Sequence, residues 1–448
     1  MATVLPKEID YTPAASLPEG TQCNSIVSSP VNGQTFGPSS IIQFDLVQRG
    51  YLVPESMYIR YKLVTTLPTT TAAAAGAVKG TPVYTPFARL ETIVGSQVVE
   101  SIQNYNQLSN MLVNCRMNYA QKVGLANSFG YSDNTSAITY AFDFSTNAPN
   151  GLDLNAATSI GASAGVGVGA NVSLAAPLGC ILSNADKLVP LKFMPSCRIQ
   201  LSLDTLGNVY NGTGTAVATT ITNFSLQNVE LCYDIIEFNP MVDQAISSRG
   251  GGAITIKSQS YLSSGVTIPS ASNGSLEFLF NQRVASLKSL FCHLSGADAT
   301  KVNGFFDSVD ITTNNGDYQW FIAGLPYPPR PISTVLNKAG ASMELSSAFG
   351  PAHDLMTSNF SINPTEFGYT IASTTTVQQM GKFYLGTNVE KLSTNGALLT
   401  GISSQGSPIS FRVSMGTATS QTAVIQLICL YDALLQIDMA SRTLVVMQ

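Results

Sequence analysis

The chain carries two similar alternating segments, LCYDII at Leu231–Ile236 and LYDALL at Leu430–Leu435. In each of them an apolar strand pattern passes through a Tyr-Asp pair into a second apolar stretch. The same landmarks precede both segments in the same order: an opening pair of strands, a helix, and an alternating strand led by arginine. Repetition on this scale indicates that one β domain is built twice.

Composition limits the classes of function. The 448 residues are enough for two domains of ordinary size, each with its own core. Charged residues make up 11% of the chain, against about a quarter in ordinary soluble domains, so neutral polar side chains fill a surface that suits packing against other protein. The formal net charge is -5 and no basic run exceeds two residues. We therefore expect no direct binding to nucleic acid.

The cysteines indicate a reducing compartment. Seven are scattered without a Cys-x-x-Cys pair, and several lie inside apolar strand patterns, where a thiol behaves as a small buried hydrophobe. The first residues show no signal-peptide pattern, so we expect a protein made in the cell interior and not secreted. Residues 155–185 carry no charge, but their alternating glycine, alanine, serine and valine favour a surface loop over a membrane span.

The landmarks divide the chain into an arm, two domains and a linker. Residues 1–38 contain several prolines and no sustained periodicity, which predicts an extended N-terminal arm. Alternating strands around one helix, at residues 108–119, predict a first domain over residues 39–246. Three consecutive glycines indicate a linker at residues 247–252. The second domain then covers residues 253–448.

Several elements of the second domain are specific expectations. Residues 276–280 and 285–292 alternate on either side of a turn and are expected to be partner strands. Asn315-Gly316 predicts a hairpin between residues 307–312 and 318–322, because this dipeptide supplies the positive φ angles of a type I′ turn. A cluster of prolines is expected to end the second of these strands. A short helical pattern follows at residues 335–343.

Two successive domains of about eight short strands, with long loops and helical excursions, are typical of an all-β chain with two jelly-roll β-sandwiches. The residues also resemble a family. Residues 44–61, 188–203, 230–238 and 276–292 resemble the double jelly-roll major capsid proteins of icosahedral DNA viruses, the lineage of adenovirus-like, virophage, polinton-like and tailless phage capsids.

The resemblance implies a structural role in a virion and no enzymatic activity. It implies a homotrimer whose six jelly rolls form a pseudo-hexameric capsomer of an icosahedral shell. The implied partners are other copies of the chain, neighbouring capsomers, minor capsid and vertex proteins and, as in many members, an internal membrane surface. The loops at residues 69–80, 142–179 and 207–219 would face outward or between subunits, and the arm would lie under or between capsomers.

Candidate sites have simpler explanations. His353 lacks the third group that a nucleophile relay needs, and His293, at the end of an apolar strand, lacks further zinc ligands. Asp307, Asp310 and Asp317 offer the oxygen ligands that calcium prefers, but their spacing differs from that of an EF-hand. We assign no catalytic, cofactor-binding or metal-binding residue.

Two further motifs are also interpreted as structural. Gly165–Gly169 lacks the second spacing of a dinucleotide fingerprint and the Lys-Ser/Thr ending of a phosphate loop. The Tyr-Asp pairs are expected to hydrogen-bond with backbone at the ends of the closing strands.

Two other interpretations remain open from the residues alone. A minor or vertex capsid protein would normally be a single jelly roll, which the repeated landmarks disfavour. A two-domain β-sandwich binding protein, of the lectin or adhesin kind, predicts a secretion signal, paired cysteines or an aromatic ligand site. Trp320 is the sole tryptophan, and none of these features is evident.

Overall fold

The structure of the chain is a computed structural model. It describes residues 18, 20–66, 77–78, 80–130, 168–211, 223–249, 252–296, 305–306, 308, 316–334, 337–350, 362, 367, 382–390, 399–415 and 422–447.

The first half of the chain forms two antiparallel sheets. One has the strand order β1 (Gln22–Ser28), β12 (Asn223–Glu237), β5 (Tyr58–Thr66) and β9 (Val168–Pro177), and β2 (Thr35–Phe36) and β4 (Tyr51–Leu52) also pair with β12. The other has the order β3 (Ile41–Asp45), β10 (Cys197–Leu203), β7 (Phe87–Val94) and β8 (Gln97–Gln103). A separate short pair consists of β6 (Ala77–Val78) and β11 (Tyr210–Asn211).

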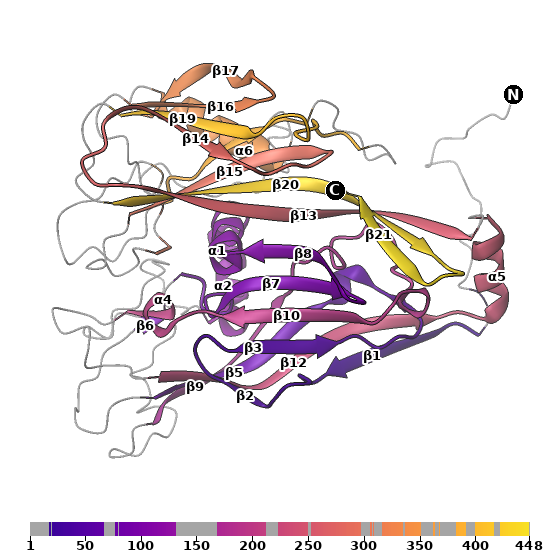
Figure 1. The fold of residues 1–448 in the computed structure, drawn as a ribbon. Helices are drawn as coiled ribbons and strands as arrows, with labels where there is room; N and C mark the ends of the chain where they lie inside the picture. Colours follow the sequence, from indigo (N-terminus) through magenta and orange to yellow (C-terminus); the bar gives the residue numbers. More distant parts are fainter. Residues whose placement is uncertain are drawn as a thin grey trace, which may run out of the picture.

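The second half repeats this plan. One sheet has the order β13 (Ala253–Ile268), β20 (Ala423–Asp438), β15 (Leu287–Gly296) and β18 (Leu385–Asn388), and β21 (Thr443–Met447) also pairs with β20. The other has the order β14 (Gly274–Phe280), β19 (Ile409–Met415), β16 (Asp317–Ile322) and β17 (Leu325–Ser333). Figure 1 shows the sheets of this second sandwich lying beside those of the first.

The connectivity of the two sandwiches is the same. Strands β1, β12, β5 and β9 occupy the places that β13, β20, β15 and β18 occupy in the second half, and β3, β10, β7 and β8 correspond to β14, β19, β16 and β17. Facing sheets in which sequence neighbours alternate between the sheets are jelly rolls. The prediction of an all-β chain with two consecutive jelly rolls is confirmed.

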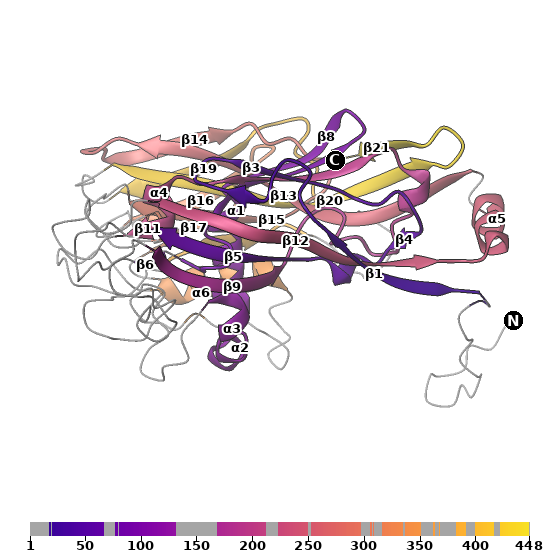
Figure 2. The same cartoon turned by 90° about the horizontal axis from the view of Figure 1, so that it is seen from below.

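Helices join or flank the strands. The longer ones are α1 (Tyr105–Arg116), α5 (Pro240–Arg249) and α6 (Lys338–Phe349), and the short ones are α2 (Tyr119–Gly124), α3 (Ala126–Phe129), α4 (Leu206–Val209), η2 (Pro54–Ser56) and η4 (Leu191–Phe193). The helix predicted near residues 108–119 is therefore present, and it ends at Arg116. Figure 2 shows α5 at one end of the molecule, beyond the ends of the long strands. No helix in the described part of the chain is long and apolar enough to span a membrane.

Period-two alternation explains how the sequence selects the buried face of each sheet. In β10, Cys197, Ile199 and Leu201 are buried, while Arg198 and Gln200 between them are only partly covered. Successive side chains of a strand point to opposite faces, so this pattern buries one row in the sandwich core and leaves the other outside. In β19 the same alternation runs from Phe411 to Met415, with Arg412 exposed between buried Phe411 and Val413.

One expectation about strand partners was wrong. The strands β14 and β15 are consecutive, but β14 pairs with β19 and β15 pairs with β18 and β20, in the opposite sheet. An alternating pattern marks a buried face and does not distinguish a hairpin from a crossing between sheets. The hairpin partner of β16 is β17, and residues 309–315 lie outside the described part.

The proline cluster and the arm also differ from expectation. Pro326, Pro328, Pro329 and Pro331 lie within β17, where a strand at the sheet edge tolerates residues without an N–H donor. Within the predicted arm, residues 22–28 form β1, an edge strand of the first sandwich that pairs with β12 over its whole length. The predicted linker begins inside α5, which ends at Arg249.

Candidate functional site at the joint between the two jelly rolls

A continuous set of contacts joins the two jelly rolls along β13. This strand of the second roll runs beside β8, the edge strand of the first (Figure 1). Three serines of β13 donate hydrogen bonds to the first roll: Ser258 to the carbonyl oxygen of Ile181, Ser260 to Oε1 of Glu100, and Ser263 to the carbonyl oxygen of Gln103. Small hydroxyl side chains therefore form the part of the joint next to β8.

Glu100 is a buried carboxylate at the centre of this joint, with 3% of its surface exposed. Besides Ser260, its donors are the hydroxyl of Thr92 at 2.7 Å and the backbone N–H of Ile181 at 2.9 Å, both to Oε2. Burial raises the pKa of Glu100, and the hydrogen bonds from Ile181, Ser260 and Thr92 act in the opposite direction. The carboxylate is thus held by donors from both jelly rolls.

Backbone groups extend the joint beyond β8. The N–H of Asp186 donates to the carbonyl oxygen of Lys257 at 2.9 Å, and the N–H of Lys257 donates to Oδ1 of Asp186 at 3.1 Å. The side-chain amide of Asn184 donates to the carbonyl oxygen of Gln259 at 3.1 Å. The segment after β9 therefore satisfies backbone groups of β13 that would otherwise lie at a free sheet edge.

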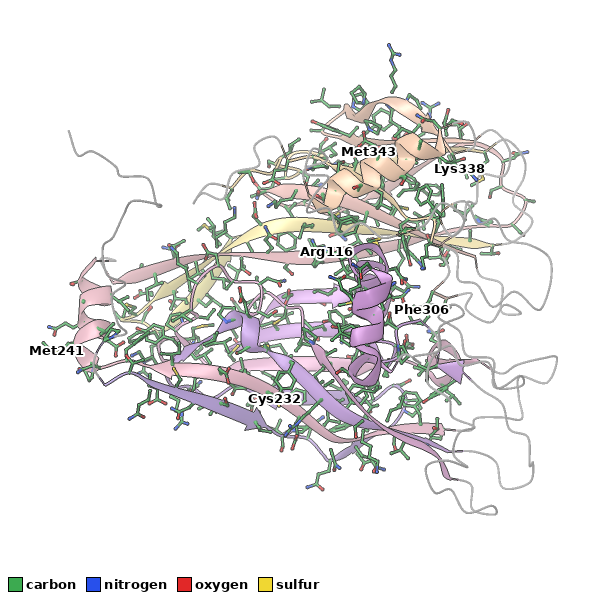
Figure 3. The ribbon with its side chains drawn as sticks, turned by 180° about the vertical axis from the view of Figure 1, so that it is seen from behind. Arg116, Cys232, Met241, Phe306, Lys338 and Met343 are labelled. Atoms are coloured by element: carbon green, nitrogen blue, oxygen red, sulfur yellow. The ribbon has the colours of Figure 1, made fainter. Side chains whose placement is uncertain are left out.

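Helix α1 supplies the remaining side of the joint. The side-chain amide of Gln107 donates to the carbonyl oxygen of Phe305 at 2.6 Å, and that of Asn114 donates to the hydroxyl of Tyr384 at 3.2 Å. At the last turn, the guanidinium carbon of Arg116 lies 5.4 Å from the ring centroid of Phe349, the last residue of α6. Figure 3 shows Arg116 at the end of α1 that faces the second jelly roll.

The two Tyr-Asp pairs lie at equivalent positions of the closing strands. Asp234 is paired across β1 with Ser25, whose hydroxyl donates to its Oδ1 at 2.6 Å. The hydroxyl of Tyr233 accepts a hydrogen bond from the N–H of Val47 at 3.0 Å. Both contacts lie within the first jelly roll.

Asp432, the counterpart of Asp234 in the second jelly roll, lies near two lysine side chains. Its side chain is fully buried, and its Oδ1 lies 3.7 Å from Nζ of Lys257 and 3.9 Å from Nζ of Lys288. The hydroxyl of Ser286 donates to Oδ2 at 2.9 Å, and the side-chain amide of Gln259 donates to Oδ1 at 3.4 Å. These contacts hold three strands of one sheet together.

The two other candidate residues that the structure describes, His293 and Asp317, lie in different sheets. His293 is buried, with Nε2 3.3 Å from the carbonyl oxygen of Phe306, and burial lowers its pKa to about 4, so its ring is neutral at neutral pH. Asp317 begins β16, while His353, Asp307 and Asp310 lie outside the described residues. Among the residues that are described, no three histidine, cysteine, aspartate or glutamate side chains form a cluster that could hold a metal ion.

The residues of the joint form no recognisable motif in the sequence. Glu100 stands in an alternating strand, where a carboxylate usually faces solvent, and the serines of β13 carry no motif. The weak signal is α1, whose polar residues Gln107 and Asn114, which reach the second jelly roll, are as buried as its apolar ones. A helix with so many amides and so few charges indicates a partner on its polar side.

No protein-family model and no curated protein matches the sequence. The fold, in contrast, resembles solved structures. The major capsid protein of Faustovirus has 12% sequence identity and a TM-score of 0.63, with 97% of this chain and 93% of that chain covered. A chain of the Sputnik virophage structure has 12% identity and a TM-score of 0.55, covering 100% and 92%.

The mavirus major capsid protein resembles the chain to the same degree. It has 11% identity and a TM-score of 0.55, with 100% of this chain and 95% of that chain covered. Likeness at such low identity shows the fold, which extends over both jelly rolls. The chain therefore has the double jelly-roll fold found in the major capsid proteins of Faustovirus and mavirus, as its sequence predicts.

Proposed function

We propose that this chain is the major capsid protein of an icosahedral virus, located in the shell of the virion, with a structural and not a catalytic role. The observation that carries the proposal is the double jelly roll, shared over nearly the whole chain with two major capsid proteins. One fold supports several functions, so the fold alone does not establish the role. The composition of the chain provides a second argument. Its 11% of charged residues suits burial against other copies of the chain.

The proposed assembly is a homotrimer. The two jelly rolls of one chain have the same topology but different residues, so each chain presents two different sides to its neighbours. Identical chains with such sides associate head to tail, and a ring of three supplies six jelly rolls with a pseudo-hexameric outline. Neighbouring capsomers, minor capsid and vertex proteins and an internal membrane surface are the further partners that we propose.

The domain limits form part of the proposal. We place the boundary within residues 247–252, because α5 ends at Arg249, β13 begins at Ala253, and the strands on each side form separate sheets. The N-terminal arm is confined to the residues before Gln22, where β1 begins.

The test is the native mass and outline of the purified chain. We expect light scattering to give three times the 47.4 kDa of one chain. Negative-stain electron microscopy should show a roughly hexagonal particle in top view. A stable monomer that binds glycans would refute the proposal and support a lectin-like sandwich instead.

A further inference from the structure

Residues 305–306 of the second jelly roll make close contact with the first. The side-chain amide of Gln107 on α1 donates to the carbonyl oxygen of Phe305 at 2.6 Å. The fully buried ring of Phe306 packs on Gly80 of the first roll so closely that a Cβ on this glycine would lie 2.9 Å from the ring. Figure 3 shows Phe306 next to α1. Residues 305–306 are therefore a clasp between the two rolls.

His293 holds the clasp from the side of the second roll. It lies on β15, and its Nε2 is 3.3 Å from the carbonyl oxygen of Phe306. Its ring stacks on that of Tyr384, with centroids 5.7 Å apart and an angle of 28° between the planes. The hydroxyl of Tyr384 in turn accepts a hydrogen bond from Asn114 of α1. One imidazole thus supports two residues that contact the first roll.

The other ring nitrogen of His293 has no partner. We assign the ring proton to Nε2, because Phe306 offers a carbonyl oxygen there, so Nδ1 keeps its lone pair. Within the described part of the chain, neither Nδ1 of His293 nor Oε1 of Gln426 has a hydrogen-bond partner, and both atoms are buried. The two residues are paired across β15 and β20, so they lie on one face of the sheet. Two buried acceptors therefore lie on neighbouring strands without a donor.

The surroundings of His293 do not favour a positive charge. On the described parts of α1, α2, α6 and the residues before β18, the charged side chains are Arg116, Lys122, Lys338, Glu344 and Lys382. Most of them are cations, as a protonated imidazole is. Burial raises the pKa of Cys115 on α1 to about 12, so this thiol stays neutral. The carboxylate of Glu344 accepts a hydrogen bond from Thr387.

We propose that His293 is an acid-sensitive switch in the joint: protonation of its Nδ1 releases the clasp at residues 305–306 and loosens α1 from the second jelly roll. The added proton creates a buried charge and an N–H without an acceptor. It finds an acceptor when the ring moves towards Oε1 of Gln426 or when water enters the joint, and both changes disturb the contact with Phe306. In a viral shell, this switch would weaken the capsomers in acidic surroundings.

The direction of the pH effect follows from burial. Burial lowers the pKa of His293 in the folded chain from 6.5 to about 4, and the hydrogen bond with Phe306 acts in the opposite direction. The open or unfolded chain therefore binds the proton first as the pH falls. His293 has no effect on stability well above its ordinary pKa, and below it the unfolding constant rises by up to about tenfold per pH unit until the folded pKa is reached.

The first test compares the wild type with His293→Gln. The glutamine amide can donate to Phe306 as Nε2 does, but it does not titrate. All other titratable groups, Glu100 included, are present in both proteins. In urea unfolding followed by the fluorescence of Trp320, we expect the unfolding constant of the wild type to rise about 20-fold relative to that of His293→Gln between about pH 7 and about pH 5. A ratio that is constant with pH would overturn the inference.

The second test follows the opening of the joint in the wild type itself. The thiol of Cys115 on α1 is fully buried, and Lys382 of the second roll lies within electrostatic range of it. The probe is dithiodipyridine, which reacts with thiols in acid, and labelled peptides are identified by mass spectrometry. We expect Cys115 to be labelled about 20-fold faster at about pH 5 than at about pH 7, while Cys197 in the core of the first roll stays protected. Equal labelling of the two thiols at acidic pH, or labelling of neither, would overturn the inference.

Discussion

Glu100 offers the most direct test of the energetics of the internal joint. Glu100→Ala removes the acceptor of three donors, the hydroxyls of Thr92 and Ser260 and the N–H of Ile181. The hydroxyls can rotate towards other acceptors, but the N–H is fixed by the backbone, and one unpaired buried donor costs about 1–3 kcal/mol. The one lost methylene, Cγ, adds about 0.8 kcal/mol. We therefore expect the free energy of unfolding to fall by about 2–4 kcal/mol.

Glu100→Gln is the matched control, because it keeps the shape and leaves all three partners satisfied. The amide oxygen accepts from Ile181 and Thr92, and the amide nitrogen donates to the hydroxyl of Ser260. We expect its stability at acidic pH to lie within about 1 kcal/mol of the wild type.

The stabilities of the wild type and of Glu100→Gln should diverge as the pH rises. Burial raises the pKa of Glu100 in the folded chain above its ordinary value of 4.5. The contribution of Glu100 to stability is therefore fully present below the pKa of the unfolded chain and is lost as the pH rises through the folded pKa. Each unit of difference between the two pKa values corresponds to about 1.4 kcal/mol. Glutamine does not titrate, so Glu100→Gln gains stability relative to the wild type across this window.

The other titratable groups near Glu100 do not obscure this difference. Burial raises the pKa values of Tyr105, Cys180 and Tyr431, so all three stay neutral over the same range. The assay is urea unfolding at matched protein concentration from about pH 4 to about pH 8. It is followed by the fluorescence of Trp320, the sole tryptophan, which is fully buried. A Glu100→Ala variant as stable as the wild type, or a Glu100→Gln difference that is constant with pH, would refute the reasoning.

Three further predictions concern the chain outside Glu100. Asp432→Ala should lower the free energy of unfolding by about 3 kcal/mol, because it removes a buried carboxylate that faces Lys257 and Lys288 and accepts a hydrogen bond from Ser286. The partly exposed Asp234→Ala should cost about 1 kcal/mol, and equal losses in urea unfolding would contradict the assigned environments. Gly401→Ala places a Cβ 2.5 Å from the carbonyl oxygen of Leu287 and should lower the melting temperature, while Gly406→Ala, with open space around it, should not. With a monomeric chain, one thiol, Cys23, should react with Ellman's reagent before unfolding, and the six buried thiols only afterwards; fast reaction of a second thiol would show that the fold is wrong around it.

The strands of the fold could be predicted because their signal is local. In β10 and β19 every second residue is apolar, and this period alone identifies a strand with one buried face. The choice of sheet could not be predicted, as β14 and β15 show, because pairing depends on strands that are distant in sequence. The repeat nevertheless fixed the overall architecture, since two copies of one strand order restrict the possible topologies.

The joint was beyond prediction for the same physical reason. Glu100 and Ser260 are 160 residues apart, and each stands in a strand where a polar residue normally faces solvent. Their burial follows from the way two complete jelly rolls pack together, which no local pattern records. The polar side of α1 carried the missing information, because amides without charges are suited to burial against hydrogen-bonding partners.

The polar character of the internal joint has a thermodynamic rationale. The two jelly rolls of one chain are linked covalently, so their effective concentration is high and the joint between them needs little net affinity. Hydrogen-bonded groups such as Glu100 and Ser260 then contribute specificity, because a wrong partner leaves them unpaired.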